Sequence, residues 1–153
     1  MEKVKNKKSF ESISGKIKLL FGILVFMQML ALCKCTGSSA DLKIDKKEIK
    51  VKDGEISEEY VNLTVIHKLN NSSSYRIVFE AKNPNIYVVD ADNDEITVIA
   101  TPPLKGKGAK FTFPFFVYGE SGGFYEVKGV IIISLFSQNK LIQRKRLIVK
   151  IVE

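Results

Sequence analysis

The sequence predicts one all-β sandwich domain in residues 41–153, preceded by a short hydrophobic segment near the N-terminus. Three observations support this prediction. Short runs rich in β-branched and aromatic residues alternate with turn-forming residues at intervals of about ten residues. No stretch after residue 40 keeps a helical period of apolar residues. Both cysteines, Cys33 and Cys35, lie before residue 41, so packing must stabilise the domain without a disulfide.

The N-terminal segment 19–33 is apolar except for Gly22 and Gln28, and a lysine-rich stretch precedes it. As a helix it would be about 22 Å long, which is short of the ~30 Å hydrocarbon core of a bilayer. This length favours a cleaved signal peptide, and the small residues Ser38 and Ala40 predict cleavage after Ala40. The long charged leader is instead typical of a retained anchor. Residues 1–40 are therefore expected to be a signal peptide or a membrane anchor, and we expect the domain to lie outside the cytoplasm.

We expect an antiparallel sandwich of seven or eight strands after residue 40. Residues that reach turn conformations cheaply, mainly Gly, Pro, Asn, Asp and Ser, separate the strands. The last two strands should form the longest hairpin, with residues 137–140 as its loop. The expected strands are 42–52, 60–67, 75–81, 86–89, 95–99, 110–118, 124–136 and 141–152.

Alternation along the strands predicts which side chains form the core. We expect Val61, Leu63, Val65, Ile77 and Phe79 to point inward, together with a stripe of three phenylalanines at positions 111, 113 and 115. Pro114 cannot donate to a neighbouring strand, so it indicates a sheet edge or a bulge. Residues 130–133 are apolar on both faces, which indicates either a strand covered on both sides or a face that meets a partner.

The net charge of +7 does not indicate nucleic-acid binding. Residues 1–40 hold seven lysines against two glutamates, so five of the seven excess positive charges belong to the leader. The domain itself is close to neutral, with positive and negative residues interspersed. The basic residues Arg144, Lys145 and Arg146 alternate across both faces of their strand, and edge strands commonly carry such charges.

Three motifs could carry chemistry, but their surroundings argue against it. Residues 119–123 match the G-x-S-x-G pattern around Ser121, yet strands are expected on both sides, where a hydrolase needs a helix after the serine. His67 is the only histidine, and we expect it at the surface at the end of a strand. Residues 90–95 alternate carboxylates, but Glu95 and Thr101 stand where an EF-hand needs glycine and glutamate. We expect a solvated acidic turn there, and no catalytic residue, metal site or cofactor.

Three asparagines lie in acceptor sequences for N-glycosylation, namely Asn62, Asn70 and Asn71. Asn70 and Asn71 lie in a turn, so they are the better acceptors, while Asn62 is expected inside a strand.

Four segments of the domain resemble the immunoglobulin-like β-sandwich modules of prokaryotic cell-surface proteins, archaeal ones among them, and more loosely the major-sperm-protein-like sandwiches. These segments are 62–65 (NLTV), 75–79 (YRIVF), 95–98 (EITV) and 123–129 (GFYEVKG). The resemblance implies adhesion, spacing or subunit contact, with no catalytic residue.

The sequence therefore indicates a non-enzymatic, exported or membrane-tethered surface module that contacts another surface or membrane protein, or a glycan, and no nucleic acid. The alternative is an accessory subunit of a membrane complex or surface filament, with residues 19–33 retained in the membrane. A hydrolase that uses Ser121 is a remote third hypothesis.

Residues 41–153, expressed without the leader, should fold into a soluble, cooperative all-β domain, because every apolar run there alternates or is bounded by turns. Far-ultraviolet circular dichroism tests this expectation, and a helical spectrum would refute it.

Overall fold

The computed structural model describes residues 38–123 and 126–153. The chain divides into two compact units, 1–37 and 38–153. The segment expected to form a hydrophobic helix, 19–33, and both cysteines lie outside the described residues. The described part is all-β and contains no helix. The prediction of an all-β domain is thus confirmed for the second unit.

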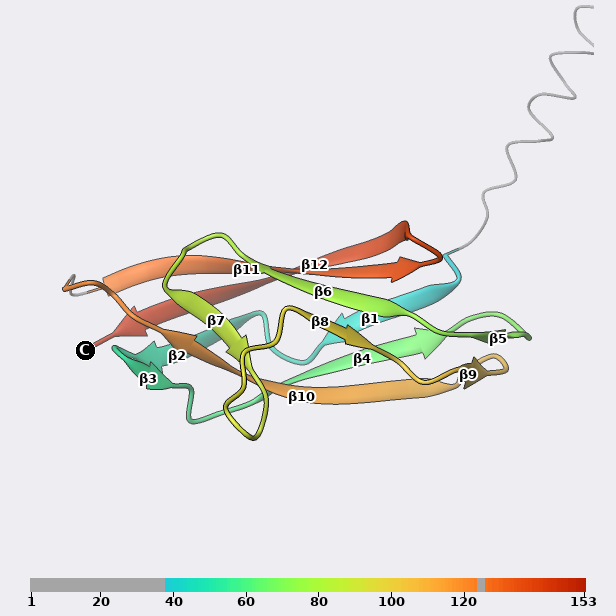
Figure 1. Cartoon of the computed structure of the whole chain (residues 1–153), viewed down its shortest axis with the longest axis horizontal. Coiled ribbons are helices and arrows are strands. Elements are labelled where there is room, and N and C mark those ends of the chain that lie inside the picture. The colour runs from blue at the N-terminus through green and yellow to red at the C-terminus, as the bar shows by residue number, and fades with distance from the viewer. Residues whose placement is uncertain (1–37, 124–125) are drawn as a thin grey trace, which may run out of the picture. The chain divides into compact units, whose positions relative to one another are not determined.

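Two five-stranded sheets form the layers of this domain, as Figure 1 shows. In the first sheet the order is β1-β4-β10-β3, and β7 also pairs with β10. In the second sheet the order is β2-β12-β11-β6-β8, and a small third sheet pairs β5 with β9. The strands are β1 (Ala40–Ile44), β2 (Glu48–Lys52), β3 (Glu55–Ile56), β4 (Val61–His67), β5 (Ser72–Ser73), β6 (Arg76–Ala81), β7 (Ile86–Val89), β8 (Val98–Ala100), β9 (Leu104–Lys105), β10 (Lys110–Gly119), β11 (Glu126–Ser137) and β12 (Lys140–Val152).

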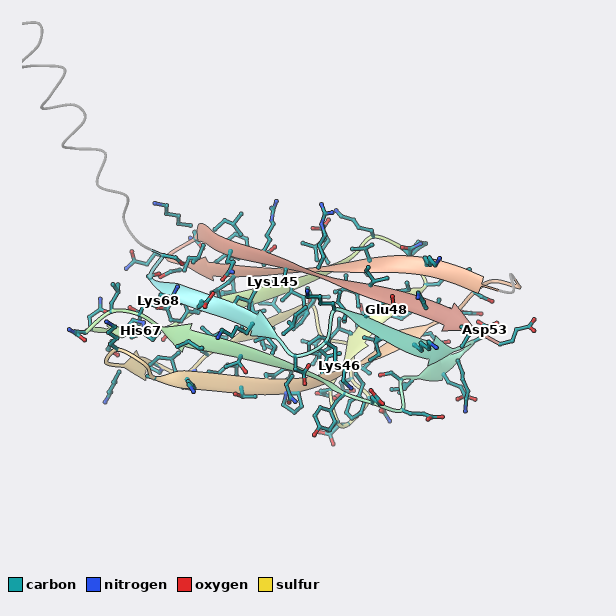
Figure 2. The ribbon with its side chains drawn as sticks, turned by 180° about the vertical axis from the view of Figure 1, so that it is seen from behind. Lys46, Glu48, Asp53, His67, Lys68 and Lys145 are labelled. Carbon is teal, nitrogen blue, oxygen red and sulfur yellow. The ribbon has the colours of Figure 1, made fainter. Side chains whose placement is uncertain are left out.

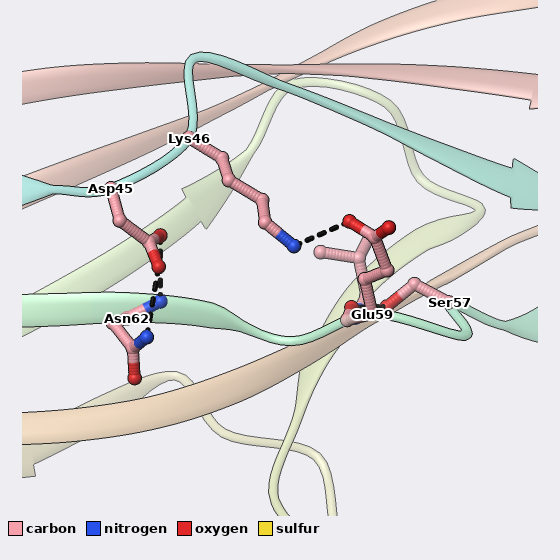
Figure 3. A network of polar contacts seen from close by, with 6 residues as sticks. Asp45, Lys46, Ser57, Glu59 and Asn62 are labelled. Carbon is pink, nitrogen blue, oxygen red and sulfur yellow. Dashed lines mark hydrogen bonds and ion pairs between the residues drawn. The ribbon is translucent and has the colours of Figure 1, made fainter.

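The first expected strand, 42–52, is divided between the two sheets, which corrects the prediction of one continuous strand. β1 pairs antiparallel with β4, whereas β2 pairs parallel with β12. The segment between them is held by Asp45, whose carboxylate oxygens each accept a 2.8 Å hydrogen bond, one from the Asn62 backbone N–H and one from its side-chain Nδ2 (Figure 3). Lys46 Nζ lies 2.5 Å from Glu59 Oε2 on the same side. The chain therefore crosses from sheet to sheet at a fixed place.

The structure also differs from the expected strands in the position of one strand, in the number of short strands and in the length of the last hairpin loop. The strand expected at 95–99 is β8 (Val98–Ala100), shifted toward the C-terminus. The described residues hold twelve strand segments where seven or eight were expected. The two-residue strands β3, β5 and β9 and the division of 42–52 into β1 and β2 account for the four beyond eight. The last hairpin closes with Ser137 opposite Lys140 and a two-residue turn. Gln138 and Asn139 both have positive φ (47° and 63°), as a type I′ turn requires.

The core lies between the two sheets and follows the alternation that the sequence predicts. Leu63, Ile77 and Phe115 are fully buried, and the Phe79 and Phe115 rings meet edge to face at 5.2 Å. Phe111 and Phe113 lie on the same face as Phe115 but are only half-buried, so the phenylalanine stripe is core at one end alone.

Pro114 lies in an edge stretch of β10 with no bulge. It pairs in register with Asn62 of β4, and no described strand pairs with the opposite side of β10 between Lys110 and Phe115. The missing N–H of the proline therefore costs no hydrogen bond.

β11 is the central strand of the second sheet, and only one of its faces is covered. Ile131 and Ile133 are fully buried in the core, whereas Val130 and Ile132 are half-buried on the outward face. The first explanation for the apolar run at 130–133, a strand covered on both sides, is therefore wrong for the described residues, and a face that meets a partner stays a prediction.

Phe115→Ala should destabilise the domain strongly, because the ring is fully buried and its removal leaves a cavity. Such truncations typically cost about 3–5 kcal/mol. Phe116→Ala, on the outward face of the same strand, should cost clearly less. Urea unfolding midpoints compare the two, and equal midpoints would show that the two faces of β10 are wrongly assigned.

Candidate binding site

Four aromatic side chains gather on the outward side of the first sheet, and we call them the aromatic patch: Tyr60, Tyr87, Phe116 and Tyr118. Phe116 and Tyr118 occupy alternate positions of β10 and therefore point away from the core. Tyr87 of β7 stands directly opposite Tyr118. Tyr60 immediately precedes β4. Tyr60 is 49% exposed and Tyr87 is 36% exposed, so the patch is open to solvent.

The rings of the patch are ordered by contacts with one another. Tyr87 and Tyr118 are stacked, with ring centroids 5.8 Å apart and an interplanar angle of 27°. Tyr60 meets Phe116 edge to face at 6.1 Å and 76°. Lys46 Nζ lies 6.0 Å from the centroid of the Tyr60 ring. Because Lys46 also pairs with Glu59, charged groups border the patch on the Tyr60 side.

The aromatic patch has the composition of a contact surface. Aromatic residues, tyrosine above all, are enriched at protein interfaces, because each ring buries a large apolar area while the hydroxyl bonds to polar groups. Sequence reasoning missed the patch. Its four residues come from three distant parts of the chain, and the pairing of β10 with both β4 and β7 brings them together.

His67 is fully buried, which corrects the expectation that it lies at the surface. Its Nδ1 lies 2.5 Å from the Tyr75 hydroxyl, and its Nε2 donates to the Asn71 carbonyl at 2.9 Å. The Tyr75 hydroxyl also donates to the Ser39 carbonyl at 3.0 Å. Burial raises the pKa of Tyr75, and the hydrogen bond to Ser39 partly opposes this rise. The network ties the end of β4 to the start of the described chain, so His67 has a structural role.

Ser121 is bound to Asp53 rather than to a histidine. Its backbone N–H donates to Asp53 Oδ1 at 2.6 Å, and its hydroxyl donates to Oδ2 at 2.7 Å. Asp53 and His67 lie at opposite ends of the domain (Figure 2). β10 ends at Gly119 and the next described strand is β11, so strands flank the loop as expected. The structure does not assemble Ser121 and His67 into one site.

The acidic turn at 90–95 uses its first carboxylate to hold its own backbone. Asp90 Oδ1 accepts hydrogen bonds from the N–H groups of Asp92 (2.9 Å) and Asp94 (3.0 Å). Within the described ranges, no group of three or more His, Cys, Asp or Glu residues is arranged to hold a metal ion. The side chains of Asp92, Asp94 and Glu95 are exposed to solvent.

The three glycosylation candidates lie in different surroundings. Asn62 is half-buried within β4, and its side-chain nitrogen donates to Asp45. Asn70 and Asn71 are exposed between β4 and β5. Use of the latter two as acceptors stays a prediction, and the bond to Asp45 makes Asn62 the poorer acceptor.

The charges at 144–146 alternate as expected, with Arg144 and Arg146 exposed and Lys145 half-buried. β12 lies between β11 and β2, so it is not an edge strand along its whole length. Its pairing with β2 begins only at Ile148, which leaves 144–146 as a local edge.

Nowhere in the described part of the chain is there a helix that could cross a membrane.

Solved structures are similar to this domain at low sequence identity. A fragment of α2-macroglobulin from Escherichia coli is similar with a TM-score of 0.53 and 11% identity, over 75% of this chain and 17% of that chain. A PapD-like domain of human CEP192 has a TM-score of 0.43 and 12% identity, over 76% of this chain and 86% of that chain. A FixG-related protein from Vibrio parahaemolyticus has a TM-score of 0.45 and 10% identity, over 75% of this chain and 96% of that chain.

No protein-family model matches the sequence, and no curated protein is significantly similar to it. Together with the two-sheet topology, the similarity to the α2-macroglobulin fragment supports an immunoglobulin-like β-sandwich fold. At 11% identity it shows the fold alone.

Asp53→Asn should make the domain less sensitive to acid. Two hydrogen bonds from Ser121 lower the pKa of Asp53 in the folded state. The bond from the backbone N–H has the larger effect, and the bond from the hydroxyl adds to it. A lowered pKa contributes stability above the unfolded-state value, and this contribution is lost as the pH falls below about 4. Urea midpoints between pH ~5 and pH ~2 should therefore fall more for the wild type than for the variant.

The matched control for this measurement is Asp92→Asn, which removes an exposed carboxylate that accepts no hydrogen bond from the described residues. Its acid sensitivity should follow that of the wild type. If Asp53→Asn does the same, then Ser121 does not hold the ionised form of Asp53.

Proposed function

We propose that this protein is a non-enzymatic binding module, exported or tethered to a membrane, that contacts another protein through the aromatic patch. The observation that carries the proposal is a cluster of four aromatic rings on the outward side of the first sheet, with Tyr60 and Tyr87 exposed and Phe116 and Tyr118 half-buried. A few aromatic anchors commonly supply most of the binding energy of an interface, surrounded by a polar rim. Lys46 and Glu59 supply charged groups at the border of the patch.

The arrangement of the rings favours a protein partner over a glycan. Sugars stack best on an aromatic face that is open and flat. In the patch, Tyr87 and Tyr118 stack on each other, and Tyr60 stands nearly perpendicular to Phe116. The patch thus offers ring edges and hydroxyls in several directions, which suits the irregular surface of a protein.

The alternative role, an accessory subunit of a membrane complex, rests on the apolar segment 19–33 and its lysine-rich leader. A retained segment would hold the domain beside its partner and raise the effective concentration of the patch. Intact mass of the protein from its native membrane distinguishes a retained segment from a cleaved one.

Tyr60→Ala combined with Tyr87→Ala should reduce capture of the partner by about tenfold, because it removes the two most exposed rings of the patch. The measurement is a quantitative pull-down of the full-length protein from native membranes. Thermal melting checks that the variant is folded.

Thr64→Ala combined with Thr112→Ala is the matched control, since these hydroxyls lie 3.3 Å apart on the outward side of the same sheet, on β4 and β10. The control should capture the partner as the wild type does. Equal capture by the wild type and the tyrosine variant would contradict the proposal. Loss of glycan binding without loss of a protein partner would assign the patch to glycans instead.

A further inference from the structure

A groove lies at the side of the sandwich where the chain crosses from β1 to β2, and we call it the basic groove. It has a volume of about 500 Å³ and is bounded by the end of β1, the crossing segment, and residues of β11 and β12. Figure 2 labels Lys145 of β12 and Lys46 of the crossing segment on this side of the domain. The aromatic patch, on β7 and β10, contributes no residue to the groove.

The basic groove is lined by four cationic side chains, namely Lys43, Lys47, Lys145 and Arg146. No acidic side chain lines it. None of the four has an ion-pair partner among the described residues, whereas Lys46, Lys52, Lys68 and Lys82 each pair with a carboxylate. Clustered cations in a concave site reinforce one another's potential and attract anionic groups. The domain as a whole is close to neutral, so this concentration of charge is local.

The floor of the basic groove is apolar. Ile44, Val130 and Ile148 line it, and Val130 stands directly opposite Ile148 in the pairing of β11 with β12. Ile148 is 41% exposed, although its neighbours Leu147 and Val149 are fully buried. An anion alone would leave this apolar surface in water, so the groove suits a ligand that carries both carboxylates and apolar side chains.

The edge of β12 before Ile148 opens toward the groove with backbone groups that no described strand pairs. The Ile148 N–H donates to the Lys47 carbonyl at 3.0 Å, so this side of β12 faces β2. Arg144 and Arg146 present their backbone groups to the same side, where no described strand pairs with them. On β1, the Leu42 N–H is already taken by Gln143 Oε1 at 2.6 Å. Unpaired edges of this kind accept an added strand.

We propose that the basic groove binds an acidic, extended segment of another protein, which adds as a strand along the edge of β12 at 144–146. Backbone hydrogen bonds to Arg144 and Arg146 would fix the segment. Its carboxylates would lie on one face of the added strand, beside Lys145, whose side chain is on the core side of β12. Alternate side chains would then fall on the apolar floor, because the side chains of a strand point to opposite faces. A bilayer surface offers no backbone groups to pair with this edge, so a protein segment uses more of the groove than a membrane does.

The proposal is tested with a fluorescent peptide of about eight residues that alternates glutamate with valine, and with full-length protein in uncharged detergent. Fluorescence anisotropy should show binding that weakens as salt rises from about 0.05 M to about 0.5 M. Lys145→Glu with Arg146→Glu should weaken binding about tenfold or more. Lys43→Glu with Lys47→Glu, both exposed residues, should do the same if the first variant fails to fold.

Lys105→Glu with Lys107→Glu is the matched control, because it changes the net charge equally at exposed sites that do not line the groove. It should change the affinity less than about twofold. An equal loss in the control would show unspecific charge attraction and overturn the proposal. Equally tight binding of a lysine–valine peptide would also overturn it.

The backbone contribution has its own test. Peptides that are N-methylated at every second residue lose the N–H groups of one edge, and at least one of the two alternating patterns should bind about tenfold more weakly. Unchanged binding of both methylated peptides would exclude strand addition. Binding of vesicles rich in anionic phospholipid, lost in Lys145→Glu with Arg146→Glu while the peptide does not bind, would assign the groove to membranes and overturn the proposal. The tyrosine variant of the aromatic patch should bind the peptide normally, so failure of one site is distinguishable from failure of the other.

Discussion

The crossing of the chain between β1 and β2 is the constraint on which the surface of this domain depends. Two hydrogen bonds from Asn62 to the Asp45 carboxylate hold the crossing segment against β4. Because of this crossing, β2 covers the edge of β12 only from Ile148 onward. The edge before Ile148 is left open, and the lysines of the crossing segment stand beside it. One local contact thus decides which half of a long strand is paired and which half is free.

Both proposed binding surfaces lie where a long strand changes its neighbours. β10 pairs with β4 at 110–115, and it pairs with β7 and β3 nearer its end. The arrival of β7 places Tyr87 against Tyr118 and so forms the aromatic patch. β12 likewise has an unpaired edge at 144–146 and a partner, β2, from Ile148. Both long strands contribute buried side chains to the core, such as Phe115 and Val117 of β10 and Leu147 of β12, so each surface rests on packed strands.

The local sequence pattern predicts the strands and their faces, because apolar and polar residues alternate along a strand that has one buried face and one exposed face. Val61, Leu63 and Val65 are buried as expected, and Pro114 lies in an unpaired edge stretch. Pattern does not reveal which strand pairs with which. The division of 42–52 between two sheets depends on Asn62, a residue of another strand. His67 is buried because Tyr75 and Asn71 are brought to its ring nitrogens. The aromatic patch likewise requires the register of β7 with β10, which no local pattern encodes.

Backbone amide hydrogen exchange along β12 tests the sheet crossing most directly, because exchange reports whether each N–H is paired. The Ile148 N–H is bonded to the Lys47 carbonyl and should exchange slowly. The N–H groups of Arg144 and Arg146 point to the same side of β12, but these residues come before the point where β2 starts to pair with it. Their N–H groups should therefore exchange much faster. Slow exchange at all three positions would mean that the first strand runs unbroken along β12, and that the basic groove does not exist.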